Sequence, residues 1–239
     1  MNKLFKGFAL SISMLTIIPF FKIHNFYKGI NGYSVMFYPL VGFLMGLFLY
    51  FLHSILSPYL PSMHLGIIIF FLMVLLTGAL HLDGFSDTID GLFVPKEKAL
   101  EVMKDPHSGG MGVIFSISFL ILKASSLAVF DTFYLLPIVM MLSRFNAVVA
   151  IYFYPYIGKG MGLLAKEELK GWQFVLTTLY VVFLTMSHVL VLVISLLVLF
   201  FIKLFFIKRY GGFSGDMYGF SIEVTELILL NAILLGLSV

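Results

Sequence analysis

The sequence has no cysteine, and charged residues make up only 11% of its 239 positions. Without cysteine, disulfide bonds, thiolate nucleophiles, zinc–thiolate sites and iron–sulfur clusters are all excluded. Soluble domains carry about 25% charged residues, whereas 61% of this chain is hydrophobic and its mean hydropathy is +1.07. These proportions exclude a soluble globular fold and indicate a multi-pass membrane protein. The formal net charge of +3 is too small to suggest nucleic acid as a partner.

Long apolar stretches dominate the chain. A helix needs about 17 to 25 mostly apolar residues to cross the hydrocarbon core, and it satisfies its own backbone there. We therefore predict an all-α, polytopic integral membrane helix bundle with seven to eight hydrophobic segments, forming a single membrane-embedded domain over residues 1–239. The longest stretch should form two spans with a turn near Ser187 and His188. The expected segments are 4–20, 33–56, 65–82, 113–130, 133–157, 172–207 and 222–239.

The basic residues are unevenly distributed between the connections. Two short connections, 57–64 and 131–132, contain no Lys or Arg, and the remaining polar segments contain many. By the positive-inside rule, we expect a multi-pass protein of the cytoplasmic (inner) cell membrane, with its active site on the cytoplasmic side. Lys3 and Lys6 do not fit this arrangement, so residues 4–20 are expected to be re-entrant or interfacial. Eleven of the 15 basic residues would share one side: Lys22, Lys28, Lys96, Lys98, Lys104, Lys159, Lys166, Lys170, Lys203, Lys208 and Arg209.

An acidic cluster follows the end of an apolar run. Asp83, Asp87 and Asp90 are spaced i, i+4 and i+7, which places them on one face of a helix. Like charges at this spacing destabilise a helix, so a divalent cation is expected to compensate them. With oxygen ligands alone, Mg²⁺ is the expected ion. A solvated helix end, or a proton or cation path through the membrane, is the alternative.

A second group of polar residues lies downstream. Lys104, Asp105 and His107 precede a glycine-rich stretch, 109–112, that leads into the next span. Backbone N–H groups at such a helix start can bind phosphate, with Lys104 as an added point charge. A plain flexible loop is the alternative.

Further charged residues lie within or beside the predicted spans. Lys123 and Arg144 occur in apolar segments, where charge is costly unless it faces the bundle interior and has a partner. The partner could be Asp131, the aspartate cluster or a substrate phosphate, which Arg can bind in bidentate fashion; structural ion pairing is the alternative. Asp216 and Glu223 follow a glycine-rich segment at a predicted helix start, where acidic residues also serve as ordinary caps.

Carboxylates able to hold magnesium, together with basic groups on one membrane face, favour phosphoryl or phosphodiester transfer. The pattern His81-Leu-Asp83-Gly84-x-x-Asp87-x-x-Asp90-Gly91, followed by Met103-Lys104-Asp105-x-His107, also resembles the cobalamin synthase family, the adenosylcobinamide-GDP ribazoletransferases. The resemblance continues along nearly the whole chain through segments 37–42, 143–144, 154–156 and 211–216. The stretch 109–111, Gly-Gly-Met, departs from the pattern that is common in the family.

The resemblance implies a magnesium-dependent transferase of a late step of cobalamin (vitamin B12) biosynthesis. Such an enzyme joins adenosylcobinamide-GDP to α-ribazole or its 5′-phosphate, forms adenosylcobalamin or its 5′-phosphate, and releases GMP. Its partners would be these substrates and the lipid bilayer, and a homo-oligomer is compatible with the sequence. On this basis Asp83, Asp87 and Asp90 are the expected catalytic and metal-binding residues, and the expected substrate-binding residues are Lys104, Asp105, His107, Lys123, Arg144, Asp216 and Glu223.

Two other functions fit part of the same pattern. CDP-alcohol-type membrane phosphotransferases also use aspartate-rich, glycine-bearing helices, but their signature needs an Arg after the first Asp-Gly, where this chain has Phe85. A cation or proton transporter would use the intramembrane acids, Lys123 and Arg144 as its pathway. Release of GMP without an ion gradient would distinguish the enzyme from the transporter.

Overall fold

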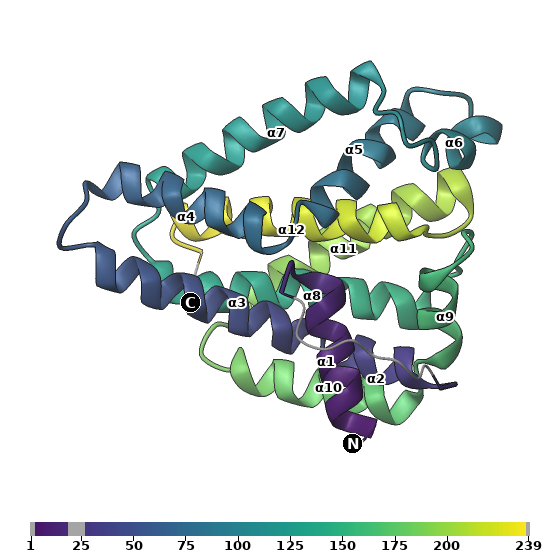
Figure 1. Ribbon diagram of the computed structural model, residues 1–239, viewed down its shortest axis with the longest axis horizontal. Coiled ribbons are helices and arrows are strands. Elements are labelled where there is room, and N and C mark those ends of the chain that lie inside the picture. The colour runs from purple at the N-terminus through teal and green to yellow at the C-terminus, as the bar shows by residue number, and fades with distance from the viewer. Residues whose placement is uncertain (1–2, 19–26, 238–239) are drawn as a thin grey trace.

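A computed structural model of the chain describes residues 3–18 and 27–237, and its regular structure in these ranges is helical (Figure 1). One isolated parallel bridge joins Tyr156 and Phe213. The predicted all-α class is confirmed. The helices are α1 (Lys3–Leu15), α2 (Ile30–Met36), α3 (Tyr38–Leu56), α4 (Ser62–Leu76), α5 (Leu80–Leu92), α6 (Lys96–Val102), α7 (Gly110–Ala128), the 3-10 turn η1 (Phe133–Leu135), α8 (Leu136–Phe153), α9 (Met161–Glu168), α10 (Gly171–Leu184), α11 (Val189–Tyr210) and α12 (Gly215–Leu234).

Within the described residues, five helices are long and apolar enough to cross a membrane: α3, α7, α8 with η1, α11 and α12. The pair α4 and α5 makes a sixth span if it is counted as one bent segment. These helices make the chain a multi-pass membrane protein, as predicted, but the count of seven to eight segments is not confirmed. The apolar helix α10 has only 14 residues, which corresponds to about 21 Å of helix against a hydrocarbon core of about 30 Å.

Three of the expected segments are interrupted in the structure, and in 33–56 the break between α2 and α3 is the single residue Phe37. The stretch 172–207 turns between α10 and α11, with Ser187 and His188 in the turn as predicted. The expected span 65–82 instead breaks after α4, and the chain direction changes by 82° between α4 and α5. Gly78 and Ala79 cause this break, because their φ angles of 58° and 57° are left-handed. That conformation costs a residue with a β carbon, here Ala79, about 1–2 kcal/mol. The surrounding packing must offset this cost, because the turn sets the direction of α5.

Burial separates the inner helices from the outer ones. Buried residues make up 89% of the apolar 18-residue stretch of η1 and α8 and 67% of that of α12. The corresponding share is 33% in each of α3, α7 and α11. The outer helices expose large apolar side chains such as Phe48, Ile121 and Phe201, as expected for surfaces that face lipid. Helix α8 packs against α3 and α12, and α12 also packs against α5. Polar groups on α8 and α12 therefore face the interior of the bundle.

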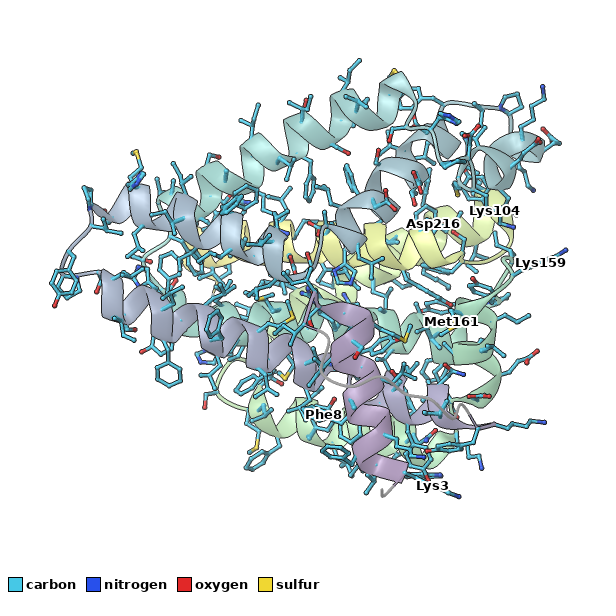
Figure 2. All side chains as sticks on the ribbon, in the orientation of Figure 1. Lys3, Phe8, Lys104, Lys159, Met161 and Asp216 are labelled. Atoms are coloured by element: carbon cyan, nitrogen blue, oxygen red, sulfur yellow. The ribbon has the colours of Figure 1, made fainter. Side chains whose placement is uncertain are left out.

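The connections divide between the two ends of the bundle. Figure 1 shows α6, α9 and the turn before α12 at one end, and the short connections 57–61, 129–132 and 185–188 at the other. Lys104 and Lys159 lie at the first end (Figure 2). The long polar connections that the structure describes therefore share one side, as the positive charges predicted, whereas residues 21–26 of the connection 21–32 lie outside the described residues.

Helix α1 crosses the long helices instead of running along them (Figure 1). Its 13 residues give about 20 Å of helix, which is too short for a span. The expectation that residues 4–20 are re-entrant or interfacial stays a prediction, and positions 19 and 20 lie outside the described residues.

Candidate active site

The predicted aspartate cluster lies on α5. Asp83 is exposed, Asp87 is half-buried and Asp90 is buried, so the helix turns its acidic face from the surface toward the interior along its length. The C-terminal end of α5 is fixed by α11, where Arg209 donates to the carbonyl of Leu92 over 2.8 Å. Helix α5 is therefore held at both ends, by the left-handed turn before it and by this contact after it.

Helices α5 and α12 approach closely through two glycines. A β carbon on Gly84 would lie 2.9 Å from the carbonyl oxygen of Asp216, and one on Gly219 would lie 3.0 Å from that of His81. Only glycine permits this approach without displacement of the backbone. The contact places Asp216 beside the aspartates of α5, and the carboxylate of Asp87 is within electrostatic range of its neighbours on both helices.

Asp83 and Asp216 line one cavity of about 270 Å³, which α1, α3, α5, α8, α9 and α12 enclose together. Lys104 lies next to Asp216 at the same end of the bundle (Figure 2) and is close enough to act on its carboxylate electrostatically. The structure thus brings together Asp83, Asp87, Asp216 and Lys104, which the sequence predicted as site residues from separate segments.

Asp90 has a different environment. Its Oδ2 accepts a hydrogen bond from the N–H of Gly109 and its Oδ1 accepts one from the N–H of Gly112, both at 2.7 Å. A carboxylate is favourable at this position, because the start of helix α7 carries partial positive charge. Two of the amides that could have bound phosphate are therefore occupied by Asp90, which fixes the start of α7 to α5.

Asp105 and His107 pair with each other on the surface. Asp105 Oδ1 accepts the backbone N–H of His107 at 2.9 Å and lies 2.7 Å from its ring Nδ1. These contacts hold the pKa of the Asp105 carboxyl below its usual value, with the backbone hydrogen bond as the largest cause. Both side chains are exposed, and neither lines the 270 Å³ cavity. Their predicted role in substrate binding stays a prediction.

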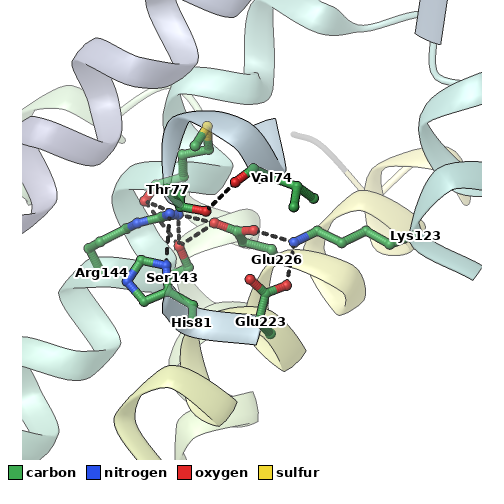
Figure 3. Close-up of polar contacts among 9 residues, drawn as sticks. Val74, Thr77, His81, Lys123, Ser143, Arg144, Glu223 and Glu226 are labelled. Atoms are coloured by element: carbon green, nitrogen blue, oxygen red, sulfur yellow. Dashed lines mark hydrogen bonds and ion pairs between the residues drawn. The ribbon is translucent and has the colours of Figure 1, made fainter. Parts of the chain in front are cut away.

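Lys123 and Arg144 are neutralised inside the protein (Figure 3). The Nζ of Lys123 lies 2.6 Å from Glu223 Oε2 and 2.5 Å from Glu226 Oε2. Arg144 donates to Glu226 Oε1 through Nη1, which also lies 2.9 Å from the Ser143 hydroxyl. All four charged side chains are at least 90% buried, and their formal charges cancel. We call these four residues the buried charge cluster.

This cluster matches the structural alternative considered for Lys123 and Arg144. Their partners are Glu223 and Glu226, and Asp131 is exposed in the connection before η1. The substrate-binding roles predicted for Lys123, Arg144 and Glu223 stay predictions, but each of these side chains already has a protein partner. From the sequence, Glu226 ranks below Glu223 and is not among the expected site residues. Charge balance was the available signal, because two cations within apolar spans require two anions.

Magnesium fits only part of the predicted ligand set. In the described ranges, no group of three or more His, Asp or Glu side chains is arranged to hold a metal ion, and both oxygens of Asp90 accept backbone N–H groups. Mg²⁺ usually takes one or two carboxylates and completes its octahedron with water and phosphate oxygens. Asp83 and Asp87, with Asp216 next to them on α12, supply such a donor set beside the cavity.

Residues 7–234 match the model of a family described as Cobalamin-5-phosphate synthase. The chain is 32% identical to an adenosylcobinamide-GDP ribazoletransferase of Desulfitobacterium hafniense, covering 92% of this chain and 93% of that protein. It is 36% identical to the protein of the same name from Desulforamulus reducens, covering 98% of both. The homologue of Acinetobacter baumannii is 34% identical over 93% of this chain and 94% of its own. No solved structure matches the chain.

Proposed function

The chain belongs to the Cobalamin-5-phosphate synthase family, and we propose that it acts as an adenosylcobinamide-GDP ribazoletransferase. The names of its relatives support this function. The glycine contact between α5 and α12 supports an assignment of this function to particular residues, because it brings Asp216 next to the α5 aspartates at one cavity. We place this site on the cytoplasmic side of the cytoplasmic membrane, because the basic connections lie at the same end.

In the proposed reaction, the ribazole 3′-hydroxyl attacks the phosphorus nearer the cobinamide. A new P–O bond forms to the ribose oxygen, the bond to the bridging pyrophosphate oxygen breaks, and GMP leaves with that oxygen. The hydroxyl proton needs an acceptor within hydrogen-bond reach. Asp83 and Asp87 are the side chains in position for this, and Asp216 lies beside them on α12. Lys104 stabilises the negative charge that develops on the leaving phosphate.

Magnesium would be held by Asp83 and Asp87 together with phosphate oxygens of the substrate. When bound, a divalent ion neutralises charge on the phosphate oxygens and orients the group for in-line displacement. The role of this chain is to keep the carboxylates in place. Asp90 contributes indirectly, because its two bonds to the start of α7 hold the loop that carries Lys104.

The two other functions have less support. The relatives described above carry the name of ribazoletransferases, which favours this reaction over that of a CDP-alcohol phosphotransferase. The charges that a transporter would use at bilayer depth, on Lys123 and Arg144, instead form a closed and neutral cluster with Glu223 and Glu226.

The test uses the full chain, purified in detergent and incubated with adenosylcobinamide-GDP and α-ribazole 5′-phosphate. We expect equal amounts of GMP and cobamide 5′-phosphate, loss of both on chelation with EDTA, and recovery when Mg²⁺ is added back. Asp131→Asn is a matched control, since this exposed aspartate lies at the opposite end of the bundle. Absence of GMP release by the wild type, with gradient-driven ion flux in vesicles instead, would refute the transferase.

A further inference from the structure

The 270 Å³ cavity has an apolar lining and a polar rim. Its apolar residues include Met14 of α1, Ile151 of α8 and Ile222 of α12. Among the side chains that line it, Asp83 is exposed and Asp216 is half-buried, so these carboxylates mark its open side. In Figure 2, Asp216 and Met161 lie on α12 and α9 at this end of the bundle. A ligand here would meet hydrocarbon inside and negative charge at the mouth.

Two buried polar atoms of the lining have no hydrogen-bond partner among the described residues. They are Nε2 of His81 and the hydroxyl of Tyr218, whose side chains both line the cavity. His81 is 3% exposed and Tyr218 is 7% exposed, so bulk water reaches neither freely. Buried polar groups in proteins are almost always hydrogen-bonded, and each exception calls for an explanation. A bound ligand that bonds to both atoms explains this pair.

The protonation of His81 follows from its neighbour. Nη2 of Arg144 lies 3.5 Å from His81 Nδ1 (Figure 3), and a guanidinium group has donors only. Nδ1 is therefore the acceptor, and the neutral imidazole carries its proton on Nε2. The cavity thus receives an N–H donor from His81 and a hydroxyl from Tyr218.

We infer that this cavity binds the ribazole substrate by its planar aromatic base, with His81 as the donor to the ring nitrogen of the base and the Tyr218 hydroxyl as the partner of the attached ribose. The inference rests on the proposed function. Pockets for small ligands span about 300–1,000 Å³, so a cavity of 270 Å³ is at the small end of this range and suits a planar base better than a corrinoid macrocycle. A benzimidazole has a hydrocarbon edge for the apolar lining and a ring nitrogen that accepts the N–H of His81. Its ribose then lies at the mouth, beside the carboxylates that accept the hydroxyl proton.

The guanine of the other substrate is the competing occupant of similar size. Its polar edge carries several N–H donors, which need acceptors, whereas the interior of this cavity offers apolar side chains, the donor of His81 and a single hydroxyl acceptor, that of Tyr218. The Asp83 and Asp216 carboxylates could pair with guanine only at the mouth. The lining therefore favours the base with the hydrocarbon edge.

The decisive variant is Tyr218→Phe. The hydroxyl has no partner among the described residues, so its removal should leave the thermal midpoint unchanged or raise it. The KM for α-ribazole 5′-phosphate should rise about 3- to 10-fold, which is the range of one neutral hydrogen bond, and the KM for adenosylcobinamide-GDP should stay within about twofold. Tyr59→Phe is the control, because Tyr59 is 80% exposed in the connection after α3.

A second variant tests the size of the cavity. Ala147 lines it from α8, and Ala147→Val should raise the KM for a ribazole 5′-phosphate with a dimethylated base more than for one with an unsubstituted benzimidazole. If both variants raise only the KM for adenosylcobinamide-GDP, or change neither KM, the inference is wrong although the transferase reaction stands. If the wild type forms no GMP from the two substrates, the proposed function itself has failed.

Discussion

The buried charge cluster makes a strong prediction about folding. Glu226 bonds to both Lys123 and Arg144 and is 1% exposed. Glu226→Gln keeps the size of the side chain but leaves two cations with one anion, Glu223. Removing one partner from a buried ion pair costs about 3–5 kcal/mol. For a chain of this length about 1 kcal/mol shifts the midpoint by roughly 2–4 °C, so we expect a decrease of about 6–20 °C.

The assay is thermal unfolding of the purified protein in one detergent, followed by circular dichroism and by the recovery of monodisperse protein. Glu97→Gln is the matched control, because Glu97 is exposed on α6 and such substitutions usually stay within about 0.5 kcal/mol. The double variant Lys123→Met with Glu226→Gln restores charge balance between Arg144 and Glu223. It should therefore melt above the Glu226→Gln single variant.

The prediction is refuted if Glu226→Gln has the same thermal midpoint as the wild type and the Glu97→Gln control. It also fails if the double variant loses at least as much stability as the two single variants combined, because neighbouring charges that depend on one another should not be additive. Either result would mean that the cluster is hydrated or separated in the membrane-embedded protein.

Three further predictions concern the acidic helix and the start of α7. Asp83→Ala and Asp87→Ala should each abolish GMP release while membrane insertion and the thermal midpoint stay normal; near-normal turnover in both variants would remove the metal assignment. Asp90→Ala should also lower turnover, because it releases the connection 93–109 from α5. Limited proteolysis within 93–109 should therefore become faster than in the other two variants. Gly112→Ala should be equally sensitive to proteolysis, because its β carbon would collide with the Asp90 carboxylate. Gly110→Ala is the control and should not be, since nothing lies within 4 Å of its β carbon. Equal sensitivity of the two glycine variants would contradict this prediction.

The composition and the apolar runs were sufficient to predict the class of fold. They also predicted the turn inside 172–207 and the gathering of basic connections at one end. The predicted number of spans is not confirmed, because helices α1 and α10 have only 13 and 14 residues. Hydropathy also does not register a change of helix direction. The turn at Gly78 and Ala79 lies inside an apolar run, and its left-handed backbone is held by tertiary packing that the sequence does not display.

The candidate site was predicted in its parts but not in its grouping. Spacing alone put Asp83, Asp87 and Asp90 in one set, because they share a helical face. A helical face is about 100° wide, however, and what each residue meets depends on the neighbouring helix. Asp90 meets the backbone of α7, and Asp83 meets the cavity that α12 closes with Asp216. Asp216, and not Asp90, is grouped with Asp83 and Asp87 because of the contact between α5 and α12, which spacing along the sequence does not reveal.

The charged residues within the spans connect stability to the site. Their cluster lies where α7, α8 and α12 meet, and Arg144 extends it to His81 on α5. A neutral cluster is needed there because two unpaired cations at bilayer depth would be costly. The same guanidinium group fixes the tautomer of His81, which lines the cavity. Loss of Arg144 should therefore destabilise the bundle. In any fraction that still folds, the imidazole of His81 could then adopt either tautomer. The cluster thus supports the proposed reaction by fixing the inner wall of its cavity.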